Sequence, residues 1–154
     1  MAFTLSSKVI KPSAPIPAEH TCDGRDASPP LTWSGAPSKT VAFALICDDP
    51  DAPVGTWVHW VLYDIPKATV ELKGGVAKTK TLADGSKQGG NDFRKVGYNG
   101  PCPPRGPAHR YYFKLYALDA PTGLAAGATK AEVIEAIEGH VLAQAELIGT
   151  YQRR

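Results

Sequence analysis

Three long apolar segments with the composition of β-strands constrain the fold of this chain most strongly. They are Thr40–Asp49 (TVAFALICDD), Trp57–Ile65 (WVHWVLYDI) and His109–Asp119 (HRYYFKLYALD). The first two are apolar almost throughout and have prolines near their ends, which is typical of buried strands. Turns rather than helices separate the segments, so they predict an antiparallel sheet. We therefore expect a mostly β protein.

The third segment alternates with the period of a strand that has one buried face. One face carries His109, Tyr111, Phe113, Leu115 and Ala117. The other face carries Arg110, Tyr112, Lys114 and Tyr116. Because the other side chains on its face look buried, His109 is predicted to lie at the rim of the core.

One helix is predicted near the C-terminus. Thr129 and Glu132 have the spacing of a capping box, in which each side chain bonds the backbone N–H of the other. The apolar stripe that follows consists of Val133, Ile134 and Ile137. Gly139 is a typical helix stop. Residues 141–152 (VLAQAELIGTYQ) fit a helix or a strand, and their alternation favours a closing strand.

Two segments rich in proline and glycine, Lys11–Pro37 and Lys73–Ala108, are predicted to be loops. The second is long for an irregular connection, and such loops are often functional. The 154-residue sequence shows no internal repeat and no linker, so residues 1–154 are expected to form a single domain. A domain of this size can bury a core without a metal or disulfides.

Charge and hydropathy argue against two kinds of partner. The formal net charge is only +2, so no broad positive field is expected to attract nucleic acid. No stretch approaches the roughly 20 apolar residues of a membrane span, and stable membrane insertion is not expected. The N-terminal sequence MAFTLSSKVIKPSAPIP lacks the apolar core of a secretory signal, which favours a cytoplasmic location.

The three cysteines are Cys22, Cys47 and Cys102. They form no CxxC pair, and their odd number does not fit a closed disulfide framework. Cys47 ends an apolar segment and is predicted to be a small core residue. Cys22 and Cys102 lie in the predicted loops. No structural disulfide is expected, because the cytoplasm keeps thiols reduced.

Four polar residues lie where predicted strands meet loops. Asp49 and Asp51 follow the first strand, beside prolines that restrict the backbone. His59 lies in the second strand, and His109 opens the third. Taken singly, a histidine in an apolar strand is usually a satisfied core residue, and aspartates beside proline are usually turn formers. Because all four recur beside rigid loops, we expect them to converge on one polar pocket.

Two blocks of the sequence resemble the signature blocks of the phosphatidylethanolamine-binding protein family. They are DDPDAPVGTWVHWVLYDIP (Asp48–Pro66) and GYNGPCPPRGPAHRYYFKLYALD (Gly97–Asp119). The chain is similar to the small prokaryotic branch of that family, described as Raf-kinase-inhibitor-like. Three further segments extend the resemblance over nearly the whole chain: His20–Pro37, Gly89–Gly100 and Gly139–Tyr151.

The resemblance implies a large central antiparallel sheet, a smaller second sheet and a few peripheral helices. It also implies a cavity that binds phosphate, acetate and similar anions, with no required cofactor or metal. The matching ligand-binding positions are Asp49, Asp51, His59, Gly100, Pro101, His109 and Tyr111. The matching positions that support the pocket are Pro53 and Arg110. Within this set, Asp51 is expected to tie down its loop through Arg110.

Two positions depart from the family pattern. Asp64 stands where many relatives have an asparagine before Ile-Pro, and we expect it to be structural. The sequence ends at Arg154, without the C-terminal helix that contributes to the cavity mouth in larger eukaryotic members. A more open mouth is therefore expected.

The pocket residues indicate how an anion would bind. His59 and His109 can each present an N–H, and Tyr111 a hydroxyl. Asp49 would repel an anion unless it accepts from a histidine or holds a proton shared with the ligand. Because free histidine titrates near ~6.5, affinity for phosphate is expected to rise as the pH falls through about 6.

Three functions fit these residues. In the first, a small anionic or phosphorylated ligand enters the pocket and the protein, which is not an enzyme, regulates a partner. In the second, loops at the pocket rim, above all Lys73–Ala108, inhibit a serine protease or a kinase. In the third, Asp49, His59 and His109 act as acid and base in hydrolysis, although no nucleophile is evident. A metal held by two histidines and a carboxylate, and a homodimer, are further alternatives.

Overall fold

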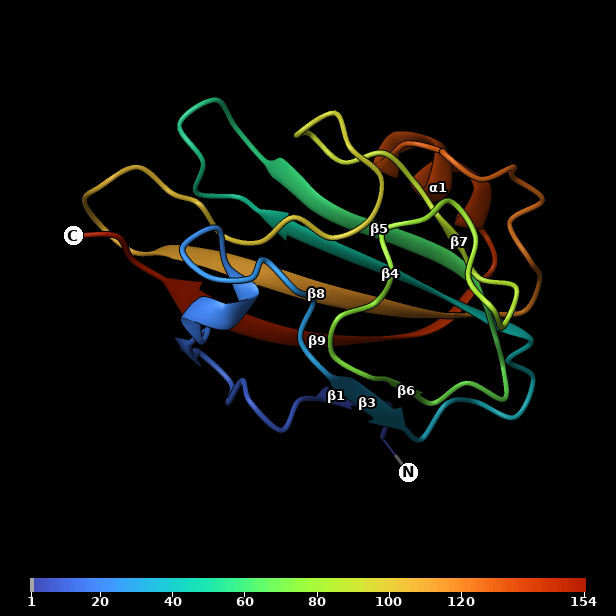
Figure 1. The fold of residues 1–154 in the computed structure, drawn as a ribbon. Helices are drawn as coiled ribbons and strands as arrows, with labels where there is room; N and C mark the ends of the chain where they lie inside the picture. The colour runs from blue at the N-terminus through green and yellow to red at the C-terminus, as the bar shows by residue number, and fades with distance from the viewer. Residues whose placement is uncertain (1) are drawn as a thin grey trace.

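The computed structural model describes residues 2–154 and consists mostly of β-strands in two sheets. The larger sheet has the strand order β2-β9-β8-β4-β5-β7, and the smaller has the order β1-β3-β6 (Figure 1). The strands are β1 (Thr4–Ser6), β2 (Ala14–Pro15), β3 (Leu31–Ser34), β4 (Ala42–Asp49), β5 (Trp57–Pro66), β6 (Glu71–Leu72), β7 (Lys87–Gln88), β8 (His109–Leu118) and β9 (Val141–Tyr151). The helices are a 3-10 helix, η1 (Ala18–His20), and an α-helix, α1 (Lys130–Ile137). The predicted fold class is confirmed.

The three predicted strands form the centre of the large sheet. β4 lies between β5 and β8 and pairs antiparallel with both. The predicted closing strand is β9, which pairs antiparallel with β8 from Tyr151, opposite His109, to Val141, opposite Leu118. The choice of strand over helix is therefore confirmed. β2 pairs with β9 in parallel, so one edge of the sheet departs from the antiparallel pattern.

The large sheet is the middle of three layers, with the small sheet on one side and α1 on the other (Figure 1). Phe43 and Leu45 of β4 enter the core between the two sheets, where Phe43 contacts Trp33. Ala44 and Ile46 enter the core beneath α1. Because alternate residues of β4 face two different cores, this strand is apolar on both faces.

Helix α1 has the predicted cap. The Thr129 hydroxyl accepts a hydrogen bond from the Glu132 N–H at 3.2 Å, and the Glu132 carboxylate accepts from the Thr129 N–H at 3.0 Å. Val133 and Ile137 are buried beneath the helix. Gly139, with a φ of 81°, ends it in the left-handed conformation that glycine tolerates. Neither α1 nor any other helix of residues 2–154 is long and apolar enough to cross a membrane.

Asp64 has the structural role expected of it. It lies in β5 with a φ of 53°. Its carboxylate accepts hydrogen bonds from the N–H and hydroxyl of Thr122 at 2.7 and 2.9 Å, and it pairs with Lys87 at 3.0 Å. These contacts fasten a surface loop and an edge strand to β5.

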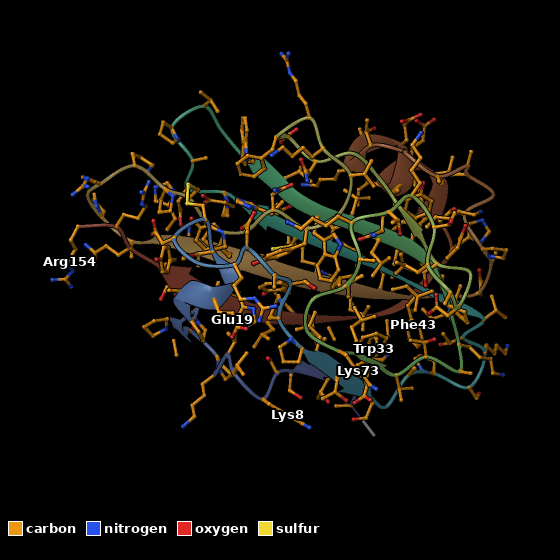
Figure 2. All side chains as sticks on the ribbon, viewed as in Figure 1. Lys8, Glu19, Trp33, Phe43, Lys73 and Arg154 are labelled. Carbon is orange, nitrogen blue, oxygen red and sulfur yellow. A yellow bond between two sulfur atoms is a disulfide. The ribbon has the colours of Figure 1, made fainter. Side chains whose placement is uncertain are left out.

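Cys22 and Cys102 form a disulfide, so the expectation of no structural disulfide was wrong (Figure 2). The bond joins two loops whose cysteines are 80 residues apart. An odd number of cysteines does not prevent two from meeting, and the third, Cys47, is free and buried as predicted. A disulfide also weighs against the cytoplasmic location, because most cytosolic thiols are kept reduced. That location stays a prediction.

The segment Lys73–Ala108 is not irregular throughout. It contains β7, which pairs antiparallel with β5 at one edge of the large sheet. Isolated bridges join Thr81 to Lys87 and Gly90 to Val96. From this edge the segment continues to the start of β8, where it contributes to the cavity described next.

Candidate functional site

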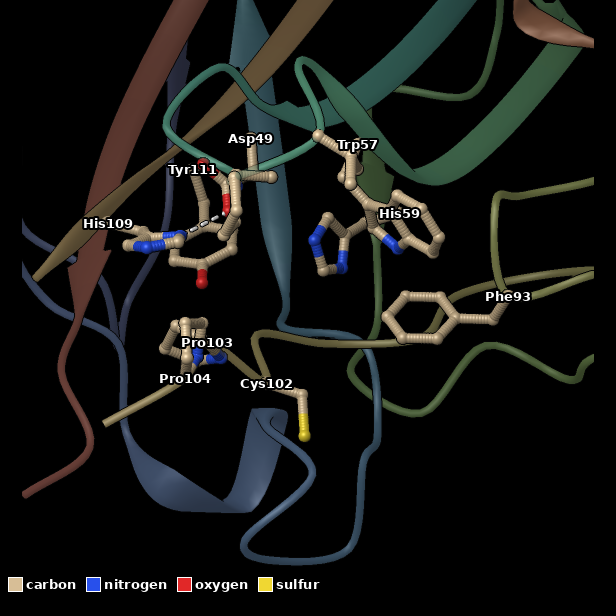
Figure 3. A pocket seen from close by; sticks show the side chains of 12 residues that line it. Asp49, Trp57, His59, Phe93, Cys102, Pro103, Pro104, His109 and Tyr111 are labelled. Atoms are coloured by element: carbon tan, nitrogen blue, oxygen red, sulfur yellow. Dashed lines mark hydrogen bonds and ion pairs between the residues drawn. The ribbon is translucent and has the colours of Figure 1, made fainter. Parts of the chain in front are cut away.

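A cavity of about 200 Å³ lies at the end of the large sheet where β4 ends and β5 and β8 begin (Figure 3). Because β4 is antiparallel to both neighbours, its last residues lie beside the first residues of β5 and β8, at one end of the sheet. Strand ends and loops 50–56 and 91–104 supply the lining residues. They are Asp49, Ala52, Pro53, Val54, Trp57, His59, Phe93, Cys102, Pro103, Pro104, His109 and Tyr111.

The structure brings together some of the predicted ligand-binding residues and not others. The cavity is lined by Asp49, His59, His109 and Tyr111, and by Pro53, which was predicted to support it. Three other predicted ligand-binding residues, Asp51, Gly100 and Pro101, do not line the cavity. Their contacts, given below, show that they hold its walls in place.

Asp49 and His109 form a buried hydrogen-bonded pair. Asp49 Oδ2 lies 2.7 Å from His109 Nδ1, and the two residues are 3% and 8% exposed. Asp49 Oδ1 accepts from the backbone N–H of Asp51 at 2.7 Å. Because an ionised carboxylate only accepts, Nδ1 of His109 carries a proton and Nε2 is the nitrogen left for a ligand. Asp49 thus accepts from a histidine, one of the two arrangements expected for it.

His59 is buried beside this pair, 2% exposed. Its ring makes edge contacts with Tyr111 and Phe93, at 5.2 and 5.3 Å between ring centroids. Nδ1 lies 2.6 Å from the Asn99 carbonyl, which can only accept, so Nδ1 is the donor. Burial lowers the pKa of His59, and the ring is therefore neutral near pH 7, with a lone pair on Nε2.

Tyr111 projects from β8 toward the cavity, close to both histidine rings (Figure 3). Burial raises the pKa of the Tyr111 phenol far above its usual value, and the negative charge of Asp49 raises it further. The phenol therefore keeps its proton at physiological pH and can donate a hydrogen bond to a ligand.

A buried loop segment at Asn99 and Gly100 holds His59 on the side away from the cavity. Asp26 accepts from the Gly100 N–H at 2.8 Å and from the Asn99 side-chain amide at 3.1 Å. A Cβ at Gly100 would lie 2.1 Å from the His20 carbonyl oxygen, so only glycine fits there. Sequence reasoning missed Asp26 and Asn99, because these contacts join residues more than 70 positions apart.

The Cys22–Cys102 disulfide and Pro101 anchor one wall of the cavity. The Pro101 carbonyl accepts from the Cys22 N–H at 3.1 Å, next to the disulfide itself. Pro103 and Pro104 follow at once and line the cavity. Pro101 therefore does not line the cavity but holds in place the segment whose next residues line it.

Asp51 and Arg110 clamp loop 50–56 to the start of β8. Arg110 donates from Nε and Nη2 to the two Asp51 carboxylate oxygens, at 2.9 and 2.8 Å, and its backbone N–H donates to Asp51 at 2.9 Å. The paired guanidinium lowers the pKa of Asp51 to about 2, and the carboxylate raises the pKa of Arg110. This is the loop-anchoring contact expected for Asp51.

Much of the cavity wall is apolar, which the sequence reasoning missed. Trp57 and Phe93 pack edge to face, with ring centroids 5.6 Å apart, and prolines form the opposite side (Figure 3). Val54 stands at the rim. A signal for Trp57 was present, because it lies two residues before His59 and so on the same face of β5. Phe93 lies in a loop and had no such signal.

Among residues 2–154, neither a fixed cation nor a cluster suited to a metal lines the cavity. Within the described part of the chain, no lysine or arginine lines it. Residues 2–154 also contain no group of three or more His, Cys, Asp or Glu side chains that could hold a metal ion. Cys102 is oxidised in its disulfide and offers no thiolate for nucleophilic attack.

Comparison with known proteins identifies the family to which a chain with this fold and cavity belongs. Residues 6–152 match the phosphatidylethanolamine-binding protein family, and the chain belongs to that family. A UPF0098 protein of Methanothermobacter thermautotrophicus is 54% identical over 138 residues, which cover 90% of this chain and 91% of that protein. Family membership supports a binding protein but does not specify its ligand.

Two solved structures resemble the whole chain. One is Escherichia coli YbcL, described as a new member of the mammalian PEBP family, with a TM-score of 0.92, 34% identity and full coverage of both chains. The other is a putative phosphatidylethanolamine-binding protein homologue of Chlamydia trachomatis, with a TM-score of 0.90, 37% identity and 99% coverage of both chains.

Proposed function

We propose that this chain is a non-enzymatic binding protein whose cavity holds the anionic, phosphate-like group of a small ligand, and that ligand occupancy regulates a protein partner. The observation that carries this proposal is the convergence of His59, His109 and Tyr111 around Asp49 in one accessible cavity. Close packing at the end of a sheet does not require three polar side chains that can all reach one small solute.

The apolar walls indicate what kind of molecule carries the anionic group. Trp57 and Phe93 present aromatic surface next to the polar side chains of the cavity. Binding sites of this composition bury an apolar body and use a few polar groups for orientation. Free phosphate has few atoms and gains at most about 1.5 kcal/mol per non-hydrogen atom, so we expect it to bind weakly. A phosphorylated ligand with an apolar body should bind more tightly.

Hydrolysis is the less favoured use of the same residues. The Asp49–His109 pair has the geometry of a general base and its orienting carboxylate. The cysteine in the lining, Cys102, is oxidised, however, and no serine or threonine lines the cavity among the described residues. Without a nucleophile beside the base, binding explains the arrangement better than covalent chemistry.

Inhibition of a serine protease or kinase is a second candidate, favoured by one observation. Val54 is 80% exposed at the rim of the cavity, on a loop that Asp51 and Arg110 hold in place. An exposed apolar side chain on a rigid loop suits contact with a partner. Inhibition assays against a panel of serine proteases and kinases, with Val54→Ser as a variant, decide between this candidate and ligand-gated regulation.

The proposed function predicts that His109→Ala weakens phosphate binding at least about tenfold, because hydrogen bonds to charged groups contribute roughly 1.5–3 kcal/mol. Isothermal titration calorimetry with inorganic phosphate and phenyl phosphate measures this loss. His140→Ala is the matched control, because His140 pairs with Asp119 at 2.8 Å on the surface, away from the cavity. Equal phosphate affinity in the His109 variant, the control and the wild type would refute the proposed site.

A further inference from the structure

We propose that the cavity takes up an oxyanion together with one proton, so that it selects phosphate-like monoanions over phosphate dianions and sulfate. The inference rests on the proposed function, that the cavity holds an anionic group, and specifies which anions it accepts. It is carried by the hydrogen-bond geometry of the two cavity histidines and by the charges around them.

Both histidines use Nδ1 against a group that only accepts hydrogen bonds. His59 Nδ1 faces the Asn99 carbonyl at 2.6 Å, and His109 Nδ1 faces the Asp49 carboxylate at 2.7 Å. The neutral form of each ring therefore has its proton on Nδ1 and a lone pair on Nε2. A fully deprotonated oxyanion brings only lone pairs to these nitrogens. The P–OH group of a monoanion instead donates a hydrogen bond to one of them.

No lysine or arginine of β4 or β8 lines the cavity to offset a second negative charge on the ligand, and Lys114 of β8 pairs with Asp48 at 3.5 Å. At the end of β4, Asp49 places a negative charge beside His109. On β8, Arg110 lies outside the cavity lining and is bound by both oxygens of Asp51. The one further titratable group that β8 contributes to the lining is Tyr111, which keeps its proton and donates one hydrogen bond.

Two charged residues next to the cavity walls are paired, and Arg94 and Lys95 of loop 91–104 do not line the cavity. Behind His59, Asp26 accepts hydrogen bonds from the Asn99 side-chain amide and the Gly100 N–H, and its Oδ2 lies 3.6 Å from Lys78 Nζ. Beyond the Cys102 wall, Arg153 pairs with Asp23 at 3.2 Å. Within the cavity lining, the charge that an entering anion meets is thus set by Asp49 and by the protonation of the two rings.

A proton placed between the ligand and Nε2 of His59 solves the lack of a donor and the excess of negative charge. It supplies the donor that a lone pair on Nε2 requires, and it removes one negative charge from a ligand that lies close to Asp49. Burial lowers the pKa of His59, so the empty site does not already hold this proton on that ring near pH 7. The proton then enters with the ligand.

The test compares anions of similar shape that hold their proton to different pH values. Affinities of phosphate, methylphosphonate (higher second pKa) and fluorophosphate (lower second pKa) are measured by calorimetry from about pH 5 to pH 9, with sulfate as the unprotonated analogue. We expect the pH at which affinity falls to follow the second pKa of each ligand, with about tenfold loss per pH unit above it. Near pH 7, sulfate should bind at least about tenfold more weakly than phosphate.

The outcomes separate this inference from the function on which it rests. One common pH midpoint for the three phosphorus anions, or equal affinities for sulfate and phosphate near neutral pH, would overturn the inference and leave an anion site standing. Failure of all four anions to bind at any pH would overturn the proposed function itself.

A variant tests the role of the lone pair directly. His59→Gln offers an amide N–H where the neutral ring offers only Nε2, so it should bring the ratio of phosphate to sulfate affinity close to one. His140→Gln, on the surface, should keep the wild-type ratio. A folded His59→Gln protein that still discriminates as strongly as the wild type would overturn the inference. The pH series on the wild type remains decisive if this variant does not fold.

Discussion

At the scale of residues, three aspartates that are close in sequence have three separate roles. Asp48 forms an ion pair with Lys130 at 2.7 Å on the side of α1. Asp49 faces the cavity, because successive residues of a strand point to opposite faces of the sheet. Asp51, past the strand end, is bound by Arg110 at the surface. The location of each carboxylate, more than its charge, decides whether it takes part in ligand binding.

The clamp between Asp51 and Arg110 predicts a pH-dependent effect of Asp51→Asn. The pKa of Asp51 is lowered to about 2, so its ionised form stabilises the fold above the ordinary value of 3.8, and this contribution is lost as the pH falls through about 2. The variant should therefore unfold at a slightly lower temperature than the wild type near pH 7. The gap should shrink as the pH falls from about 4 toward 2 and close below about 2, in thermal melts followed by circular dichroism. An equal gap at neutral and acidic pH would rule out the ionised clamp as its cause.

The polar residues that line the cavity could be predicted from the sequence, whereas those that hold them could not. Recognisable strands carry these residues: Asp49 ends β4, His59 lies near the start of β5, and His109 begins β8. Antiparallel pairing therefore brings them to one end of the sheet. Asp26 and Asn99 lie in loops, where no periodic pattern indicates which side chain faces which backbone group. Their contact depends on the finished fold.

At the scale of elements, the long strands were predictable and the short ones were not. β4, β5, β8 and β9 each have enough residues to show an apolar or alternating pattern. β2, β6 and β7 have two residues each, and β1 has three. So short a strand is defined by the partner with which it pairs rather than by its own composition. The disulfide was missed for the same reason, because it depends on which two loops meet.

The Cys22–Cys102 disulfide predicts a loss of both stability and ligand affinity when it is removed. The double variant Cys22→Ser/Cys102→Ser should lose about 2–5 kcal/mol of unfolding free energy, measured by guanidinium denaturation. Phosphate affinity should also fall, because the bond anchors the loop that carries Pro103 and Pro104. Dithiothreitol should shift the wild type toward the variant and leave the variant unchanged. Identical denaturation midpoints with and without reductant would contradict a stabilising bond.

At the scale of the whole molecule, the three layers produce a cavity at one end of the sheet. The central strands β4 and β5 are buried on both faces along most of their length, whereas β8 and β9 each have a partly exposed face. The backbone polar groups of these strands are satisfied by pairing with one another. Where β4 ends and loops replace strands, the side chains face a space that the layers do not fill. The cavity therefore lies at this end of the sheet and not in the cores between the layers.

The most direct test of this account is a crystal structure of the protein purified without phosphate and then soaked in phosphate. We expect an anion in the cavity, within hydrogen-bond distance of His59 Nε2 and the Tyr111 hydroxyl and beside the Asp49–His109 pair. A well-ordered cavity that holds only water at saturating phosphate, or phosphate bound solely at another place on the molecule, would contradict it.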